Sequence, residues 1–369
     1  MKKYFDNFYD WWKNIDKFIF LIILFLFILG LFFSLVSTSL IASDKLDTNS
    51  YYFFFKHFIF IILAISTLLF ISFLNQDFLI KLSVFLFLIS LLTLILVPFL
   101  GVEVKGSKRW IDIAFLPRFQ PIEILKPFLI IFLSSILSLE KKSLYLKYFL
   151  SITIIVPISL LLISQPDLGQ TLLILSVWLV LIFVSGVNLY IFFSIFLFLS
   201  LIVSYLIIYV AKFNYIKIRL ISFLDSNSSN NYQAEKASDA IASGGFFGKG
   251  IGEGTLNSRI PEAHTDYIIS VISEEFGVII ILSIIIMYLV FYYKVIQKIN
   301  FVQKSKFKLI LIGCITIVLL QMFVHVGVNI RLLPTTGMTL PFLSYGGSSI
   351  ISTAVISGLI LNFTKRKLN

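Results

Sequence analysis

Ten long runs of apolar residues, separated by short polar segments, dominate the chain. They cover roughly residues 18–41, 52–73, 78–100, 121–139, 148–164, 171–186, 188–211, 267–292, 309–330 and 345–363. Apolar runs of about 17 to 25 residues are long enough to cross a bilayer as helices. The pattern therefore predicts an all-α, polytopic membrane protein with about ten transmembrane helices. Residues 1–369 are expected to form a single integral membrane domain.

The distribution of lysines predicts the orientation of these spans. Most lysines fall at the termini or in the loops on one side of the spans: Lys2, Lys3, Lys13, Lys17, Lys81, Lys141, Lys142, Lys147, Lys294, Lys298, Lys304, Lys306, Lys308, Lys365 and Lys367. By the positive-inside rule this side is the cytoplasm, so both termini are predicted to be cytoplasmic. The longest polar segment, residues 212–266 between spans 7 and 8, is then a large external loop.

Composition supports the membrane assignment and narrows the function. Hydrophobic residues make up 59% of the chain, well above the share of about 45–50% that is usual in soluble domains. The net charge of +11 is explained by topology, so it gives no reason to expect a nucleic-acid partner. The single cysteine, Cys314, lies in an apolar run, which excludes a disulfide framework or a cysteine metal site within the chain.

A polar segment meets the eighth apolar run near Asp266. Thr265 is predicted to be the N-cap residue, which places Asp266 in the first helical turn and at the mouth of the span. Ser270 and Ser273 share its helix face, with Glu274 near the edge and deeper, where a carboxylate needs a partner or a wet cavity. Asp266 at that mouth is a candidate base. The alternative is that it only supports the helix start.

The external loop of residues 101–120 carries more cations than its position requires. Lys105, Lys108, Arg109 and Arg118 oppose only two acids. They indicate an anion site for a phosphate or diphosphate, or a tolerated exception to the positive-inside rule. Glu123 and Lys126, at the start of span 4, share a helix face, so they either serve a functional site or neutralise each other.

Three further segments are unusual. Asp167 lies in a break between spans that puts it at the external surface. The glycine-dense segment 243–252 lacks P-loop spacing and predicts close backbone approach to a ligand or between helices. Residues 329–349 are apolar yet rich in helix breakers, which indicates a re-entrant segment buried in protein or lining a cavity.

Together these residues resemble the SEDS family, membrane glycosyltransferases of the FtsW and RodA type that polymerise lipid II into glycan strands. The matching motifs, in family order, are Lys108-Arg109-Trp110-Ile111, Gln120-Pro121-x-Glu123-x-x-Lys126, Gln165-Pro166-Asp167-Leu168-Gly169, Ser243-Gly244-Gly245 with Gly248-x-Gly250-x-Gly252, Pro261-Glu262-x-His264-Thr265-Asp266, Glu274-Glu275-x-Gly277 and Pro341-Phe342-x-Ser344-Tyr345-Gly346-Gly347-Ser348-Ser349. Ile122 departs from the family, which usually has Ser after Gln-Pro. The motifs around Asp266 and Pro341 are more similar to division members of the FtsW type than to elongation members of the RodA type.

The resemblance implies an external cavity in which Asp266 takes the proton of an acceptor sugar hydroxyl. Cations would hold the departing diphosphate, the candidates being Lys108, Arg109, Lys126 and Arg259, with Mg²⁺ or Mn²⁺ as an optional helper. Glu123, His264, Glu274 and Ser344 are further candidate substrate-binding residues from the motifs. The resemblance also implies lipid II as substrate, and a class B penicillin-binding transpeptidase and other division membrane proteins as partners. The expected location is the bacterial inner membrane, at the division septum.

Two other function classes fit parts of the pattern. A lipid II flippase would also need a polar cavity and cations, but no internal repeat of the kind found in many transporters is visible. A pure scaffold of a division complex would leave Asp266 and the external cations without a role. The motif residues cluster at the predicted external ends of spans, which favours surface chemistry.

Overall fold

The computed structural model describes residues 9–39, 51–104, 106–113, 117–140, 142–210, 213–224, 232–256 and 260–365. Helices dominate this part of the chain: α2 (Lys17–Ser39), α4 (Tyr52–Phe73), α5 (Gln76–Leu100), α6 (Pro121–Leu137), α7 (Leu144–Ser164), α8 (Leu168–Val184), α9 (Leu189–Tyr209), α10 (Asn214–Leu224), α11 (Tyr232–Gly244), α12 (Ile268–Phe276), α13 (Val278–Ile299), α14 (Ser305–Asn329) and α15 (Gly347–Phe363). A small antiparallel hairpin pairs β1 (Val102–Val104) with β2 (Ser107–Trp110). The predicted all-α membrane fold is confirmed.

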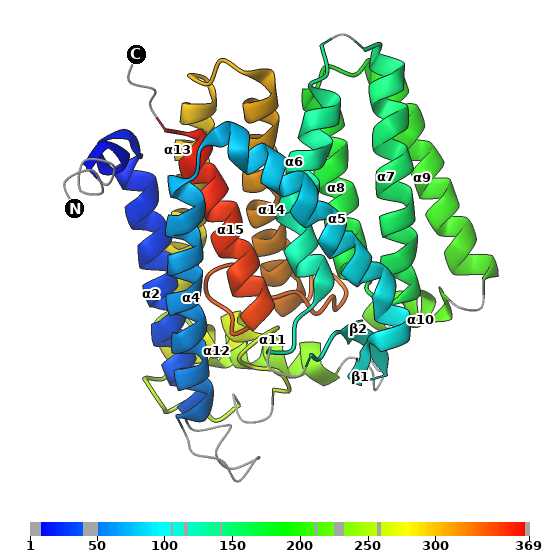
Figure 1. Cartoon of the computed structure of the whole chain (residues 1–369). Helices are drawn as coiled ribbons and strands as arrows, with labels where there is room; N and C mark the ends of the chain where they lie inside the picture. Colours follow the sequence, from blue (N-terminus) through cyan, green and yellow to red (C-terminus); the bar gives the residue numbers. More distant parts are fainter. Residues whose placement is uncertain are drawn as a thin grey trace.

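Seven of these helices, α2, α4, α5, α7, α9, α13 and α14, are long and apolar enough to cross a membrane. The shorter α8 and α15 are apolar as well, and α6 has 17 residues that include Glu123 and Lys126. α2 begins and α15 ends at the same end of the bundle, as an even number of crossings requires (Figure 1). We call the opposite end, which the lysine pattern predicts to be external, the outer end.

The eighth predicted span is not one helix. The run 267–292 divides at Gly277 into α12 and α13, because Gly277 has φ +82° and ψ 171°. Residues with a side chain avoid this region of backbone space, so a glycine can interrupt a helix that the apolar pattern would continue. The membrane-length helix is therefore α13, while the short α12 packs at the outer end against α11.

The segment 212–266 is also more ordered than the predicted loop. It contains α10 and α11, which lie at the outer end of the bundle (Figure 1). Tyr215 of α10 donates its hydroxyl to the Ile163 carbonyl of α7 at 3.1 Å, which fixes α10 to the end of that helix. Residues 225–231 lie outside the described residues.

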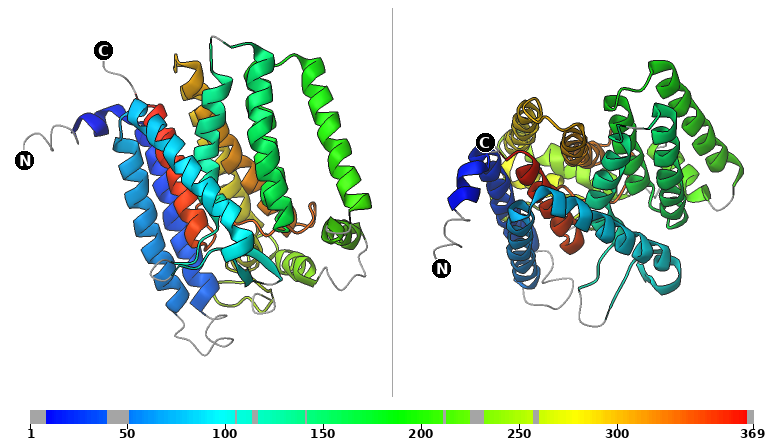
Figure 2. Two further views of the ribbon diagram at one scale, coloured as in Figure 1. Left: turned by 45° about the vertical axis from the view of Figure 1, so that its right-hand side comes forward. Right: turned by 45° about the horizontal axis from the view of Figure 1, so that its top comes forward.

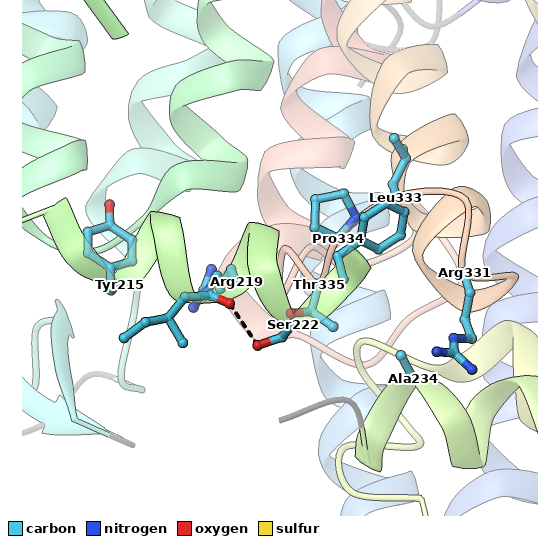
Figure 3. Close-up of a pocket in the computed structure, with 10 residues that line it drawn as sticks. Tyr215, Arg219, Ser222, Ala234, Arg331, Leu333, Pro334 and Thr335 are labelled. Carbon is cyan, nitrogen blue, oxygen red and sulfur yellow. Dashed lines mark hydrogen bonds between the residues drawn. The ribbon is translucent and has the colours of Figure 1, made fainter. Parts of the chain in front are cut away.

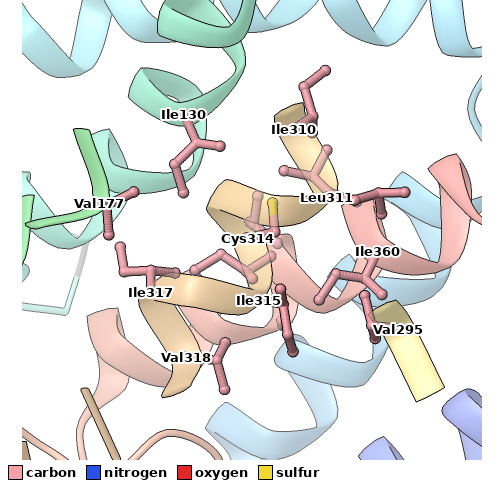
Figure 4. Close-up of a cluster of buried hydrophobic side chains, with 14 of the residues drawn as sticks. Ile130, Val177, Val295, Ile310, Leu311, Cys314, Ile315, Ile317, Val318 and Ile360 are labelled. Atoms are coloured by element: carbon pink, nitrogen blue, oxygen red, sulfur yellow. The ribbon is translucent and has the colours of Figure 1, made fainter. Parts of the chain in front are cut away.

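The core is centred on α14 and α15. α15 packs against α4, α6 and α14, and from Ser348 to Phe363 all but one of its residues are buried. Figure 4 shows the apolar cluster around Cys314 of α14, which includes Ile130 of α6 and Val177 of α8. α9, in contrast, lies at the edge of the bundle (Figure 2), and no residue of its apolar stretch is buried within the chain.

The segment between α14 and α15 re-enters the bundle, as its sequence predicts. Phe342 is fully buried, with its ring centroid 5.1 Å from that of Phe27 in α2 and 6.2 Å from that of Phe291 in α13. This anchor fixes the polar residues on either side of it.

Candidate active site

Asp266 lies in the turn that precedes α12, not in its first helical turn. Tyr267 rather than Thr265 is the N-cap residue, and it makes no side-chain cap hydrogen bond. The amide groups of Thr265 and Asp266 both donate to the Glu262 carbonyl at 3.1 Å. Glu262 itself has a positive φ of 58°. The turn is thus held by its own backbone, and Asp266, which is half-buried, is not a helix-start residue.

The re-entrant segment packs directly on this turn. Ser344 donates its hydroxyl to the Thr265 carbonyl at 2.7 Å, and the Tyr345 amide donates to the His264 carbonyl at 3.0 Å. A Cβ on Gly337 would lie 3.6 Å from Asp266 Oδ2, so the carboxylate faces the backbone of that loop. Ser344 therefore positions the turn through its backbone.

Asn329, the last residue of α14, links Asp266 to two helices. Its side-chain amide donates to the Asp266 carbonyl at 3.1 Å and to the His325 carbonyl at 2.8 Å. Its Oδ1 accepts the Ser270 hydroxyl at 2.7 Å. Asn329 is fully buried. It was not identified as a site residue from sequence, since an Asn at a helix end is common and only the fold brings it to Asp266.

His264 belongs to a group of rings next to Asp266. Its ring centroid lies 5.5 Å from that of Phe53 and 5.6 Å from that of Tyr345. The ring centroid of His57 lies 5.5 Å from that of Tyr345. α4 and the re-entrant segment therefore meet at His264, which places the imidazole at the edge of the Asp266 site.

Glu123 and Lys126 form a buried ion pair. Lys126 is only 1% exposed, and its ammonium lies 2.8 Å from both carboxylate oxygens of Glu123. Gln170 of α8 donates to Glu123 Oε1 at 2.7 Å. Of the two interpretations left open by the sequence, mutual neutralisation describes this geometry, and Lys126 Nζ is not exposed to a substrate in it.

Asp167 is buried rather than at the external surface. Its carboxylate accepts the Gln120 side-chain amide at 2.8 Å and the Gln170 backbone amide at 3.4 Å. Arg109 Nη1 lies 3.8 Å from Asp167 Oδ1. Burial raises the pKa of Asp167, while the Arg109 cation and the Gln170 amide oppose that shift. The turn had looked ordinary in sequence because these partners come from other elements.

Arg109 fastens the hairpin to the turn between α7 and α8. Its Nε donates to the Gln165 carbonyl at 3.0 Å and its Nη2 donates to the Pro166 carbonyl. Its side chain is only 16% exposed, so its donors serve the fold. Arg118 pairs with Asp112 at 3.1 Å on the surface, Lys108 is exposed, and Arg259 lies outside the described residues. The predicted anion site is therefore not assembled around Arg109.

Glu274 is a structural anchor for the glycine-rich segment. It is fully buried and accepts Lys249 Nζ at 3.1 Å and the amides of Thr255 and Leu256 at 3.0 Å. A Cβ on Gly244 would overlap the Ser273 carbonyl. The predicted close backbone approach is therefore between this segment and α12. Ser270, Ser273 and Glu274, predicted to share or border the helix face of Asp266, are buried.

A cavity of about 310 Å³ opens beside this site, between α10, the start of α11 and the loop after α14. Figure 3 shows Arg219 of α10 and Arg331 of the loop on two sides of it. Tyr215, Ser222 and Thr335 add polar atoms to the lining. Burial lowers the pKa of Arg219, and the neighbouring Arg109 cation adds to that shift. These two arginines were missed from sequence because they lie 112 positions apart.

The suggested divalent cation needs ligands, and we searched the described part of the chain for side chains that could hold it. No group of three His, Cys, Asp or Glu side chains there is arranged to hold a metal. Asp167 and Glu123 are joined through Gln170 and are already paired with Arg109 and Lys126. A Mg²⁺ or Mn²⁺ ion held partly by substrate phosphates stays a prediction.

One family model, described as a cell cycle protein and named for FtsW, RodA and SpoVE, matches residues 16–369 of the chain. The chain belongs to this family. The match covers nearly the whole described chain, including both the Asp266 turn and the re-entrant segment. The resemblance to the SEDS family is thereby confirmed.

Similar proteins and structures agree with this assignment. The chain is 29% identical to a probable peptidoglycan glycosyltransferase FtsW of Caulobacter vibrioides, over 97% of this chain and 91% of the relative. It is 30% identical to the probable FtsW of Haemophilus influenzae, over 96% and 93%. A chain of a peptidoglycan synthase complex superposes with TM-score 0.79 at 25% identity, covering 95% and 97%. RodA of Thermus thermophilus gives TM-score 0.70 at 25% identity, covering 95% and 96%.

Proposed function

We propose that this protein is a peptidoglycan glycosyltransferase that polymerises lipid II into β-1,4-linked glycan strands. The family and its glycosyltransferase relatives support the reaction class. The observation that carries the proposal within this chain is the placement of Asp266, a half-buried carboxylate held at the outer end by Asn329 and facing the re-entrant loop.

The reaction needs a base and an anchored diphosphate. Asp266 accepts the proton of the acceptor 4-hydroxyl as its oxygen attacks C1 of the donor sugar, and the C1–O bond to the diphosphate breaks. A single displacement inverts the anomeric carbon, so an α-linked donor gives a β link with one catalytic carboxylate. The backbone contacts of Asn329 and Ser344 fix the turn that carries this carboxylate, which favours a defined geometry for proton transfer.

The proposed setting is septal wall synthesis in the bacterial inner membrane. The FtsW-named relatives support division over elongation, in which a RodA-type role is the alternative. The fold match to a peptidoglycan synthase complex that coordinates polymerisation and crosslinking supports a class B penicillin-binding transpeptidase as partner. Other division membrane proteins complete the proposed assembly, and nucleic acid has no part in it.

The test is glycan polymerisation by the purified protein with lipid II, with and without a cognate transpeptidase, for wild type and Asp266→Asn. Loss of a general base costs about 10² to 10⁴ in rate, whereas lipid II binding is expected to persist. Asp239→Asn is the matched control, because Asp239 is an acid of α11 that pairs only with Lys236 among the described residues. A folded Asp266→Asn variant that polymerises at more than about a tenth of the wild-type rate would refute the base assignment.

A further inference from the structure

Two arginines line one cavity without an acidic partner. Arg219 and Arg331 are both half-buried, and neither makes a hydrogen bond or an ion pair with another described residue. Arg219 instead lies over the Tyr215 ring, with its guanidinium carbon 5.8 Å from the centroid. Asp167 attracts Arg219 at longer range but is already paired with Arg109. Partly buried cations without an ion-pair partner of their own are costly, so a cavity that contains two of them is suited to an anion.

The chemistry and size of the cavity favour a phosphate-type anion. Guanidinium groups form paired, planar hydrogen bonds with phosphate oxygens, and two such groups on different walls match an anion with oxygens on more than one phosphorus. A volume of about 310 Å³ accommodates a diphosphate. The Tyr215 ring supports the Arg219 side chain from beneath.

The cavity is also at the depth where a lipid headgroup would lie. α10 follows α9 at its outer end, and its apolar residues Ile218, Ile221 and Leu224 are 46%, 53% and 81% exposed. A short helix with exposed apolar residues and cations is typical of the membrane interface. Ile218 is part of both this exposed surface and the cavity lining, which joins the lipid-facing side of α10 to the arginines.

The loop that lines this cavity continues to the Asp266 site. Thr335 is a lining residue, and Gly337, two residues later, faces Asp266 Oδ2. Resting on the function proposed above, we propose that Arg219 and Arg331 form the site that binds the diphosphate of the lipid-linked donor. This site replaces the anion site predicted at Arg109 and Lys126, because the side-chain donors of those two residues are hydrogen-bonded within the protein.

The experiment measures binding of farnesyl diphosphate to the detergent-solubilised full chain by calorimetry, with farnesol as the ligand without phosphate and inorganic diphosphate as competitor. Arg219→Gln and Arg331→Gly are each expected to weaken binding about tenfold or more. Lys217→Ala, on the same helix but exposed and outside the lining, is the matched control and binds as wild type. If inorganic diphosphate displaces farnesyl diphosphate, the site recognises the phosphates. If it does not, the lipid chain contributes part of the binding.

Arg331→Gly separates binding from folding. Arg331 has a positive φ of 56°, a conformation that glycine adopts without strain, so this variant is expected to melt at or above the wild-type temperature while it loses affinity. Wild-type protein that binds farnesyl diphosphate no better than farnesol overturns the proposal. So does unchanged affinity in both arginine variants.

Lipid II turnover distinguishes this proposal from the proposed function. If both arginine variants bind farnesyl diphosphate normally, while wild type polymerises lipid II and Asp266→Asn does not, the diphosphate site is wrong and the enzyme assignment stands. If the arginine variants lose binding but the wild-type protein with its transpeptidase makes no glycan, the site stands and the polymerase assignment fails.

Discussion

At the scale of single residues, Glu123 and Lys126 pair within one helix, and Gln170 of α8 adds a hydrogen bond to the pair. The three-residue spacing of Glu123 and Lys126 predicts a shared helix face, which the 2.8 Å ion pair bears out. Their burial was not predictable, since it depends on Gln170, 47 positions later. The same holds for Asp266, whose partner Asn329 lies 63 positions away. Local spacing predicts which helix face two residues share. How deeply they are buried and which residues they contact depend on tertiary packing.

The first residue-scale prediction concerns Lys126. Lys126→Ala leaves the Glu123 carboxylate buried without its cation, and breaking a buried pair in this way costs about 3 to 5 kcal/mol of stability. We expect a marked loss of thermal stability in detergent. The double variant Glu123→Gln with Lys126→Met removes both charges and is expected to recover most of that loss.

A different result would restore the original hypothesis for Lys126. If Lys126→Ala melts like wild type but needs much more lipid II for half-maximal polymerisation, the ammonium contacts substrate rather than Glu123 alone. Lys147→Ala, at a half-buried lysine of α7, is the control for general loss of a cation.

At the scale of helices and loops, apolar periodicity located the spans but not every break. The run 267–292 was assigned to one span, although Ser273, Glu274, Glu275 and Gly277 interrupt its apolar residues just before the break. The break follows from contacts with the glycine-rich segment: the Val278 amide donates to the Gly245 carbonyl at 3.0 Å. α10 and α11 were missed for a related reason, since both are short and lie in a polar segment that hydropathy assigns to a loop.

Gly277→Ala tests whether this glycine sets the boundary between α12 and α13. The backbone there has φ +82°, and an added Cβ would overlap the Phe246 carbonyl, so strain of about 1 to 3 kcal/mol is joined by a steric clash. We expect lower thermal stability and reduced polymerisation, because the α12 boundary supports the turn of Asp266. Thermal melting in detergent measures the stability, and the lipid II assay measures polymerisation.

Gly186→Ala is the matched control for Gly277→Ala. Gly186 also has a positive φ, of 90°, but a Cβ there would meet nothing within 4 Å. The control should therefore lose only the strain component. Equal destabilisation of the two variants would show that close packing against the glycine-rich segment contributes nothing.

At the scale of the whole molecule, the order of motifs was sufficient to predict the fold class and family. The motifs lie at the ends of helices that are far apart in sequence, yet the bundle brings them to one end, as the predicted topology requires. The arginine pair of the cavity was beyond reach from sequence, because Arg219 and Arg331 meet only when α10 folds back beneath α7 and α14 ends beside it. Composition predicts that the helices lie in a lipid bilayer. Which cations lie close together depends on the three-dimensional packing.

The last prediction concerns orientation in the membrane. The lysine distribution predicts that a reporter fused after Asn369 is cytoplasmic and that one inserted near Ser228, between α10 and α11, is external. A third insertion at Gly106, in the hairpin turn, should also be external, although the neighbouring Lys108 and Arg109 oppose the positive-inside rule. That insertion is the most demanding of the three. Orientation is a summed bias over short loops, so the many lysines on the other side should outweigh this one loop. Reporters of enzymatic activity that require the cytoplasm or the exterior would measure each position in living cells. Finding the Asn369 and Ser228 reporters on the same side would refute the ten-span model with the Asp266 site outside.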